Sequence, residues 1–145
     1  MISGYSAHGN EDGAFKQADT EILHDDRGHD LRRIIMNRQS NQMTIYVGLT
    51  DRETGKQKYD NEKYIAILKK VCLSYHVVFS SQLINGCYYH EDGRFVEENT
   101  LALMMIDVPE QTVIEIAKDL CAFFNQESVM ITSSPTNIIF VKEQL

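Results

Sequence analysis

The stretch TLALMMIDV, residues 100–108, is apolar on both sides of a strand. Side chains alternate between the two faces of a strand. One face therefore carries Leu101, Leu103 and Met105, and the other carries Ala102, Met104 and Ile106. Strands of this kind lie inside a sheet whose two faces are both covered. The stretch predicts a central strand that needs a second layer on each side.

Shorter patterns on either side of this stretch predict the remaining elements. Strand-like alternation begins at Met43 and continues to Leu49. Helical spacing joins Tyr64 to Leu68, and Pro109 suits the first turn of a second helix. The expected strands cover 43–49, 76–90, 94–108, 128–132 and 137–141, and the expected helices cover 61–75 and 110–126.

The order of these elements is β-α-β-β-α-β, followed by a short extra C-terminal strand. This order is typical of the split βαβ, or ferredoxin-like, α+β fold, in which two helices cover one face of an antiparallel sheet. The length fits one such domain, over residues 43–145. Residues 1–42 are rich in glycine and poor in large apolar side chains, which predicts a disordered or loosely docked arm. The spacing of Leu31, Ile34 and Ile35 would allow a weak helix there.

The second face of the sheet has no cover in this arrangement, because both helices lie on the first. Soluble monomers rarely leave a large apolar patch open. A second copy of the same sheet is the simplest cover, so the pattern predicts a homodimer through the sheet. The alternative cover is the N-terminal arm or the C-terminal segment of the same chain.

Composition narrows the classes of function and location. The net charge of −7 argues against nucleic-acid binding, which requires a basic face. No apolar run is long enough to span a bilayer, and the N-terminus has no secretory signal pattern. Three cysteines, an odd number, do not form a disulfide framework. We therefore expect a cytoplasmic protein that binds neither nucleic acid nor a membrane.

Residues of the kinds that carry chemistry are present, but not in catalytic patterns. Cys87 and His90 lie three apart on a strand and so face opposite sides, without a second pair to complete a metal site. Cys87 could act as a nucleophile with His76 or His90 as its base. However, the residues around Cys87 do not resemble the turn that presents a catalytic nucleophile. No phosphate-binding glycine loop is present. The sequence predicts no catalytic residue, no metal and no cofactor. Whether the protein is an enzyme stays open, and the absence of these patterns favours a protein that is not one.

The stretch FFNQESVMITSS, residues 123–134, joins the second helix to a strand through polar residues. Gln126 and Glu127 could hydrogen-bond free backbone groups at the helix end and act as a structural clamp, which is the favoured interpretation. Alternatively, Glu127 meets Tyr46, Glu98 and Asn99 at one edge of the sheet and lines a polar pocket.

Several short segments resemble a bacterial family that is known only as the domain of unknown function number 3574. The resemblance covers about residues 43–141, and the junction after the second helix is its most specific part. The matching positions are Tyr46, Gly48, Leu49, Gly86, Tyr88, Asp92, Gly93, Glu98, Asn99, Phe124, Gln126, Glu127, Ser128 and Val129. The Gly-Gln-Trp-like segment of the family is Gly-Cys-Tyr here. The resemblance supports the fold and implies no activity, because none is established for the family.

Three functions remain open. The first is a non-catalytic homodimeric module that binds a small ligand or a protein. The second is a small-molecule enzyme with a pocket near Tyr46, Glu98 and Glu127, and the third is an acidic inhibitor or adaptor from a phage or mobile element. The candidate ligand-binding residues are Tyr46, Tyr88, Glu98, Asn99, Gln126 and Glu127.

Overall fold

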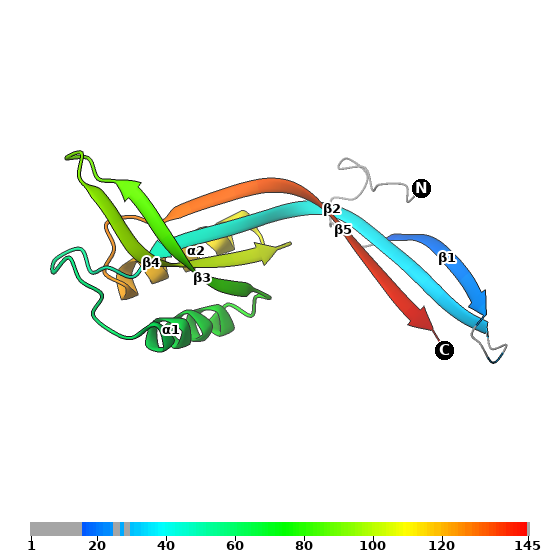
Figure 1. The fold of residues 1–145 in the computed structure, drawn as a ribbon. Helices are drawn as coiled ribbons and strands as arrows, with labels where there is room; N and C mark the ends of the chain where they lie inside the picture. Colours follow the sequence, from blue (N-terminus) through cyan, green and yellow to red (C-terminus); the bar gives the residue numbers. More distant parts are fainter. Residues whose placement is uncertain (1–15, 25–26, 28–29, 145) are drawn as a thin grey trace. The chain divides into compact units, whose positions relative to one another are not determined.

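The computed structural model describes residues 16–24, 27 and 30–144, which form five strands and two helices (Figure 1). In chain order these are β1 (Lys16–His24), β2 (Asp30–Gly48), α1 (Asn61–Ser74), β3 (Ser80–Tyr89), β4 (Phe95–Ile106), α2 (Glu110–Phe123) and β5 (Met130–Gln144). The chain divides into two compact units. One is Gln42–Ser134, and the other combines Met1–Asn41 with Pro135–Leu145.

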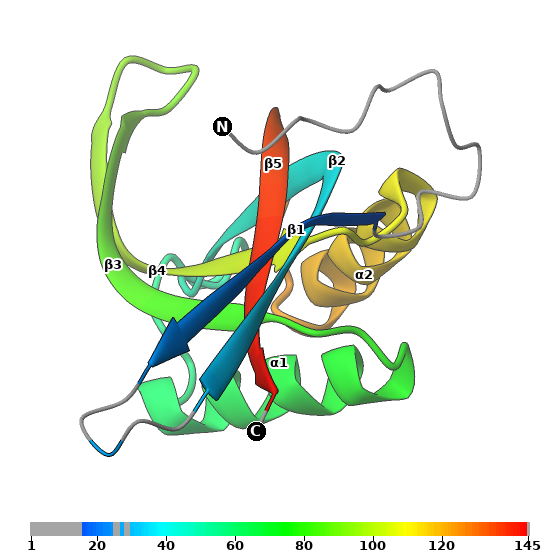
Figure 2. The same cartoon turned by 90° about the vertical axis from the view of Figure 1, so that its right-hand side faces the viewer.

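The unit Gln42–Ser134 has the predicted ferredoxin-like arrangement. β4 pairs antiparallel with β2 on one side, where Leu103 lies opposite Ile45, and with β3 on the other, where Leu101 lies opposite Leu83. β5 pairs with the free side of β2, so β2 and β4 are the central strands. Figure 2 shows α1 running along β3 and the β3–β4 ladder curving strongly toward its hairpin. The prediction of an α+β fold with a central strand over residues 100–108 is confirmed.

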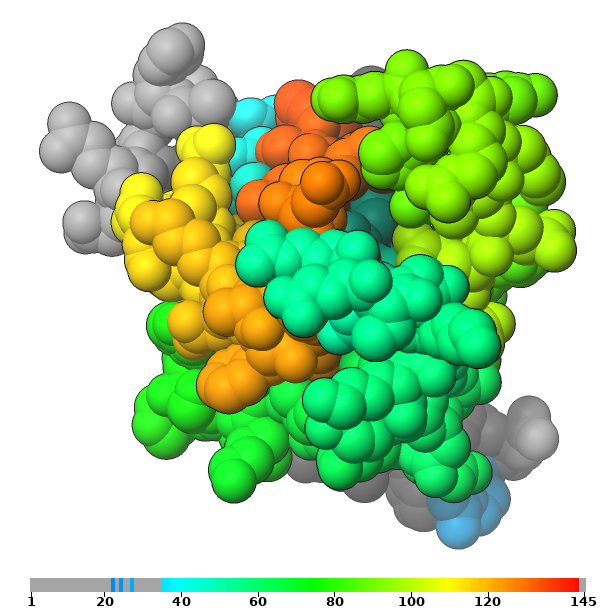
Figure 3. Space-filling model, turned by 90° about the vertical axis from the view of Figure 1, so that its left-hand side faces the viewer, coloured from blue at the N-terminus to red at the C-terminus, as the bar shows by residue number. Residues whose placement is uncertain are grey.

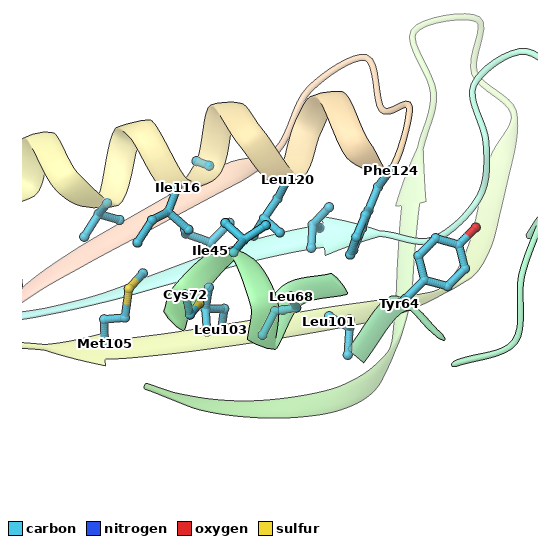
Figure 4. Close-up of a cluster of buried hydrophobic side chains, with 14 of the residues drawn as sticks. Ile45, Tyr64, Leu68, Cys72, Leu101, Leu103, Met105, Ile116, Leu120 and Phe124 are labelled. Carbon is cyan, nitrogen blue, oxygen red and sulfur yellow. The ribbon is translucent and has the colours of Figure 1, made fainter. Parts of the chain in front are cut away.

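One hydrophobic core lies between this sheet and the two helices (Figure 4). The predicted face of β4, with Leu101, Leu103 and Met105, is at most 1% exposed. The predicted stripes of both helices are buried against it, with Leu68 on α1 and Leu120 on α2 fully enclosed. Burial of each such side chain contributes about 1.5–3 kcal/mol to folding. This core determines which face of the sheet points away from the helices.

The opposite face of β4 is less well covered. Ala102 and Met104 are half-buried, and Ile106 is 40% exposed. Within the unit Gln42–Ser134 both helices pack on the other face, so the pattern that motivated the homodimer is present. The homodimer itself stays a prediction.

The unit that holds both ends of the chain differs from the expectation. β1 pairs antiparallel with β2, from Lys16 opposite Asn37 to His24 opposite Asp30. The segment around Ile34 is therefore a strand and not the weak helix that its spacing allowed. A strand ladder is held by backbone hydrogen bonds, which side-chain composition does not reveal. Residues 1–15 lie outside the described residues, and a loose docking of the arm stays a prediction.

The C-terminal segment also departs from the predicted pattern. The expected strands over 128–132 and 137–141 are not separate, because β5 is continuous from Met130 to Gln144 and includes Pro135. β5 pairs with β2 and lies outside the path of the other strands, and a proline is tolerated in such an edge strand. Pro135–Leu145 groups with the N-terminal residues, whereas the sequence predicted one domain over 43–145. In the described part of the chain, neither helix is long and apolar enough to cross a membrane.

Candidate functional site

A hollow of about 530 Å³ lies in the unit Gln42–Ser134, on the face of the sheet opposite the helices. Its strand residues alternate with those of the core, since Tyr46 follows the buried Ile45 and Thr100 precedes the buried Leu101. In Figure 3 the hollow opens between the loop after β2, the β3–β4 hairpin and the segment that joins α2 to β5. A volume of this size is typical of small-molecule sites.

Two glycines form the floor of the hollow. A Cβ added at Gly48 would overlap the carboxylate of Glu98, and one added at Gly86 would overlap the hydroxyl of Thr100. In both positions the missing side chain leaves space that a neighbouring polar group occupies. The glycines thereby let the Glu98 carboxylate lie close against the sheet.

One backbone donor holds the carboxylate of Glu98. The backbone N–H of Thr50 donates to Glu98 Oε2 at 3.0 Å. Tyr88 is the neighbour on the hairpin side, and its pKa is raised, first by burial and then by the negative charge of Glu98. A carboxylate with a donor in place has a defined orientation before any ligand arrives. Glu98 therefore presents a preorganised negative charge to the hollow.

The loop that supplies the Thr50 N–H is itself built around Asp51, a buried carboxylate. Asp51 Oδ1 accepts from the backbone N–H of Glu53 at 2.9 Å and of Thr54 at 3.1 Å, and Oδ2 accepts from Asn125 Nδ2 at 2.9 Å. The Asn125 hydrogen bond and the two backbone N–H groups hold the pKa of Asp51 below its usual value. The ionised Asp51 is the centre that gives this short loop one conformation.

The junction after α2 fixes the loop from the other side. Asn125 adopts a left-handed backbone with φ of 49°, a conformation that Asn tolerates at a helix C-terminus. The N–H of Gln126 donates to the carbonyl of Cys121 at 3.0 Å and closes the helix end. Gln126 Nε2 donates to the carbonyl of Thr50 at 2.6 Å. Gln126 thus acts as the clamp that the sequence suggested for this junction.

Glu127 does not share this role. Its side chain is 74% exposed, and its Oε2 lies 3.8 Å from Nε2 of His90 on the hairpin. The favoured interpretation of a buried clamp is therefore wrong for Glu127. Gln126 turns toward the loop and satisfies its carbonyl, which leaves the next side chain on the open side, at the wall of the hollow.

The structure brings together most of the predicted ligand-binding residues. Those that line the hollow are Tyr46, Tyr88, Glu98, Gln126 and Glu127. Asn99 does not line it, because it lies on the opposite face of β4, where its Nδ2 donates to Gln57 Oε1 at 2.9 Å. The sequence reading missed Thr50, Arg52 and Arg94 at the hollow. The signal for Thr50 and Arg52 is the polar, turn-rich connector that follows residue 49.

The cysteine candidate has no activated thiol. Cys87 is exposed and its Sγ lies 3.7 Å from Glu97 Oε2; loss of hydration together with that negative charge raises the pKa of Cys87. A nucleophilic cysteine requires the opposite shift. His90 lies 3.7 Å from Asp92 and 3.8 Å from Glu127, so its neighbours are carboxylates and not a thiol. Among the described residues there is no group of three ligand side chains that could hold a metal ion.

The fold belongs to the class of small ferredoxin-like α+β units with a hollow on the uncovered face of the sheet. No protein-family model matches the chain, and no curated protein does either. The resemblance to the domain of unknown function number 3574 therefore stays a prediction.

Solved structures do resemble the chain. A phage SAM lyase in complex with S-methyl-5'-thioadenosine has 22% sequence identity and a TM-score of 0.55, and the match covers 72% of this chain and 88% of that one. The same lyase in its apo state matches with equal identity and TM-score, over 73% of this chain and 89% of that one. GlnK from B. subtilis in complex with ATP matches at 16% identity and a TM-score of 0.45, over 68% and 82% of the two chains. The likeness to the lyase is one of fold.

Proposed function

We propose that this chain binds S-adenosylmethionine, or a nucleoside thioether derived from it, in the hollow, and that it cleaves the bound sulfonium compound. The observation that carries the proposal is the Glu98 carboxylate, which the Thr50 N–H holds against a glycine floor. The resemblance to the phage SAM lyase adds support because its fold is shared.

The lining of the hollow suits this ligand in shape and charge. The rings of Tyr46 and Tyr88 offer flat apolar surfaces on which a purine base can stack. Gly48 and Gly86 allow the ligand to approach the backbone closely. The carboxylates of Glu98 and Glu127 favour a cation, such as a sulfonium, in the same space.

The proposed cleavage requires no covalent bond between the substrate and the protein. When the bond from sulfur to the methionine Cγ breaks, sulfur keeps the electron pair and leaves as the neutral thioether S-methyl-5'-thioadenosine. The carbon gains an electron pair from the substrate itself as the bond to sulfur breaks. Either the substrate carboxylate attacks it and closes a lactone, or the neighbouring Cβ–H bond supplies the pair and forms an alkene while its proton passes to water. In both routes the protein contributes orientation and electrostatic stabilisation.

The test is to incubate the full chain with S-adenosylmethionine and separate the products by liquid chromatography with mass detection. We expect S-methyl-5'-thioadenosine together with a second product, whose mass and retention distinguish lactone from alkene. Glu98→Gln keeps the size of the side chain and removes its charge, so we expect cleavage to fall at least about a hundredfold. Equal rates of cleavage by the unmodified chain and Glu98→Gln would reject the proposal. So would calorimetry that detects no binding of S-adenosylmethionine or of S-methyl-5'-thioadenosine.

The alternative is a module that binds the same class of ligand without converting it. The partial exposure of Ala102, Met104 and Ile106 favours, for either function, a homodimer through the uncovered face of the sheet. A closed homodimer would also shield the hollow from water. Saturable binding with unchanged ligand after long incubation would support the non-catalytic module.

The acidic inhibitor or adaptor from a phage or mobile element remains a further alternative. Its support is the net charge of −7 and the phage origin of the SAM lyase that resembles the chain in fold. Capture of a basic protein partner by the full chain, unaffected by Glu98→Gln, would favour it over both ligand-binding functions.

A further inference from the structure

The hollow carries charges of both signs. Glu98 and Glu127 line it together with two arginines, Arg52 from the loop after β2 and Arg94 from the end of the hairpin. A purely cationic ligand would need only the carboxylates. The arginines therefore indicate that the ligand also has a negatively charged end.

The two arginines are in different states. Arg94 Nε lies 3.8 Å from Asp92 Oδ2, so its charge is partly compensated within the hairpin. The side chain of Arg52 is exposed and makes no hydrogen bond or ion pair with any residue that the structure describes. A guanidinium at the wall of a hollow without a partner is free to take one from a ligand.

The backbone of Arg52 is nevertheless fixed. Its N–H donates to the carbonyl of Asn125 at 3.1 Å, and the preceding residue, Asp51, is held by the side chain of Asn125. Gln126 Nε2 donates to the carbonyl of Thr50, two residues before Arg52. The base of the arginine is thus anchored to the end of α2, and only its side chain has to be ordered when a ligand binds.

We propose that Arg52 determines specificity by pairing with the α-carboxylate of the amino-acid end of the ligand. This inference rests on the proposed function, in which the ligand is S-adenosylmethionine. Arg is suited to this role because its planar guanidinium can donate two parallel hydrogen bonds to a carboxylate. Asn125 is a positioning residue for Arg52, since its carbonyl accepts the N–H of Arg52 and its side-chain amide binds the carboxylate of the preceding Asp51.

Charge supplies a direct way to test this pairing. Decarboxylated S-adenosylmethionine keeps the nucleoside, the sulfonium and the amine but lacks the carboxylate, so it is the more positive ligand. The chain has a net charge of −7 and two glutamates at the hollow, which by themselves favour the decarboxylated compound. A preference for S-adenosylmethionine must come from a cation such as Arg52.

The experiment measures the dissociation constants of both ligands by calorimetry on the full chain, or kcat/KM where cleavage occurs. Arg52→Gln should weaken S-adenosylmethionine about tenfold or more and change the decarboxylated ligand by less than about twofold. Arg52→Lys should recover part of the loss, because it restores charge without the planar fork. Lys56→Gln is the matched control: it removes one positive charge from the same loop, does not line the hollow, and should leave both ligands unchanged.

The outcomes separate the two proposals. An equal loss for both ligands in Arg52→Gln, or no loss for either, overturns the role of Arg52 while the proposed function stands. An effect of Lys56→Gln as large as that of Arg52→Gln also overturns it, because the loop charge and not the arginine would then be responsible. If the unmodified chain binds neither ligand, the proposed function fails and Arg52 has no role in it.

Discussion

The side-chain amide of Asn125 donates a hydrogen bond of 2.9 Å to the carboxylate of Asp51, a residue 74 positions earlier in the chain. Asn125 directly follows the C-cap of α2, and Asp51 organises the loop that follows β2. The contact ties the end of a helix to the loop whose Thr50 N–H orients Glu98. A substitution that breaks this hydrogen bond would therefore disturb the loop and, through it, the orientation of Glu98 in the hollow.

Asp51 should make the stability of the protein sensitive to acid. Its folded-state pKa is depressed, so its contribution is fully present above its unfolded value of about 3.9 and is lost as the pH falls through the folded value. In Asp51→Asn this contribution is absent at every pH. We expect the melting temperature of the unmodified chain to exceed that of Asp51→Asn at pH 6, and the difference to shrink steadily toward pH 2. A constant difference over this range would contradict the assignment.

A methyl group at Gly48 should damage the site more than the fold. In Gly48→Ala the added Cβ overlaps the flexible end of Glu98, which can swing away at little cost in stability. We expect a melting temperature within about 3 °C of the unmodified chain and a loss of about tenfold or more in affinity for S-methyl-5'-thioadenosine. In the background of Glu98→Gln the same change should add little, since both variants disturb one interaction. Additive losses would show that Gly48 acts independently of Glu98.

Gln126 and Glu127 are neighbours with opposite expected effects. Gln126→Ala leaves the carbonyl of Thr50 without its donor and should destabilise the protein by about 1–2 kcal/mol. Glu127→Ala removes an exposed side chain and should change stability by less than about 0.5 kcal/mol. Chemical denaturation of both variants measures the difference. If Glu127→Ala lowered the free energy of unfolding more than Gln126→Ala, Glu127 and not Gln126 would be the clamp.

The predicted homodimer can be tested by substitutions at two neighbouring residues of β4 that lie on opposite faces of the sheet. Met104 is on the uncovered face of β4, whereas Leu103 is fully buried in the core. Light scattering of the unmodified chain at micromolar concentration should give the mass of a dimer. Met104→Glu should give a folded monomer, while Leu103→Glu should unfold the unit, because an unpaired charge in the core is very costly. A monomeric unmodified chain with an intact fold would rule out the homodimer.

The fold of residues 42–134 was largely readable from the sequence. Hydrophobic periodicity located the core faces of β2, β4 and both helices, and the order of elements indicated the ferredoxin-like class. Two parts were misread, the segment around Ile34 and the separate strand over 137–141. Both belong to longer strands, β2 and β5, which are held by backbone hydrogen bonds to β1 and to β2, respectively. Such pairing leaves no periodic trace in a polar segment.

The site divides in the same way. The sequence alone offered, as an alternative to the clamp, a meeting of Tyr46, Glu98, Asn99 and Glu127 at one edge of the sheet, and all of these except Asn99 line the hollow. Only the tertiary structure decided that Asn99 points to the other face, that Gln126 and not Glu127 is the clamp, and that Arg52 stands at the wall of the hollow. The positions of Gln126 and Arg52 depend on the contact between the end of α2 and the loop after β2, which are 74 residues apart at the Asn125–Asp51 hydrogen bond. Local patterns specify which side of an element a residue occupies, whereas contacts between distant loops are selected by the packing of the whole unit.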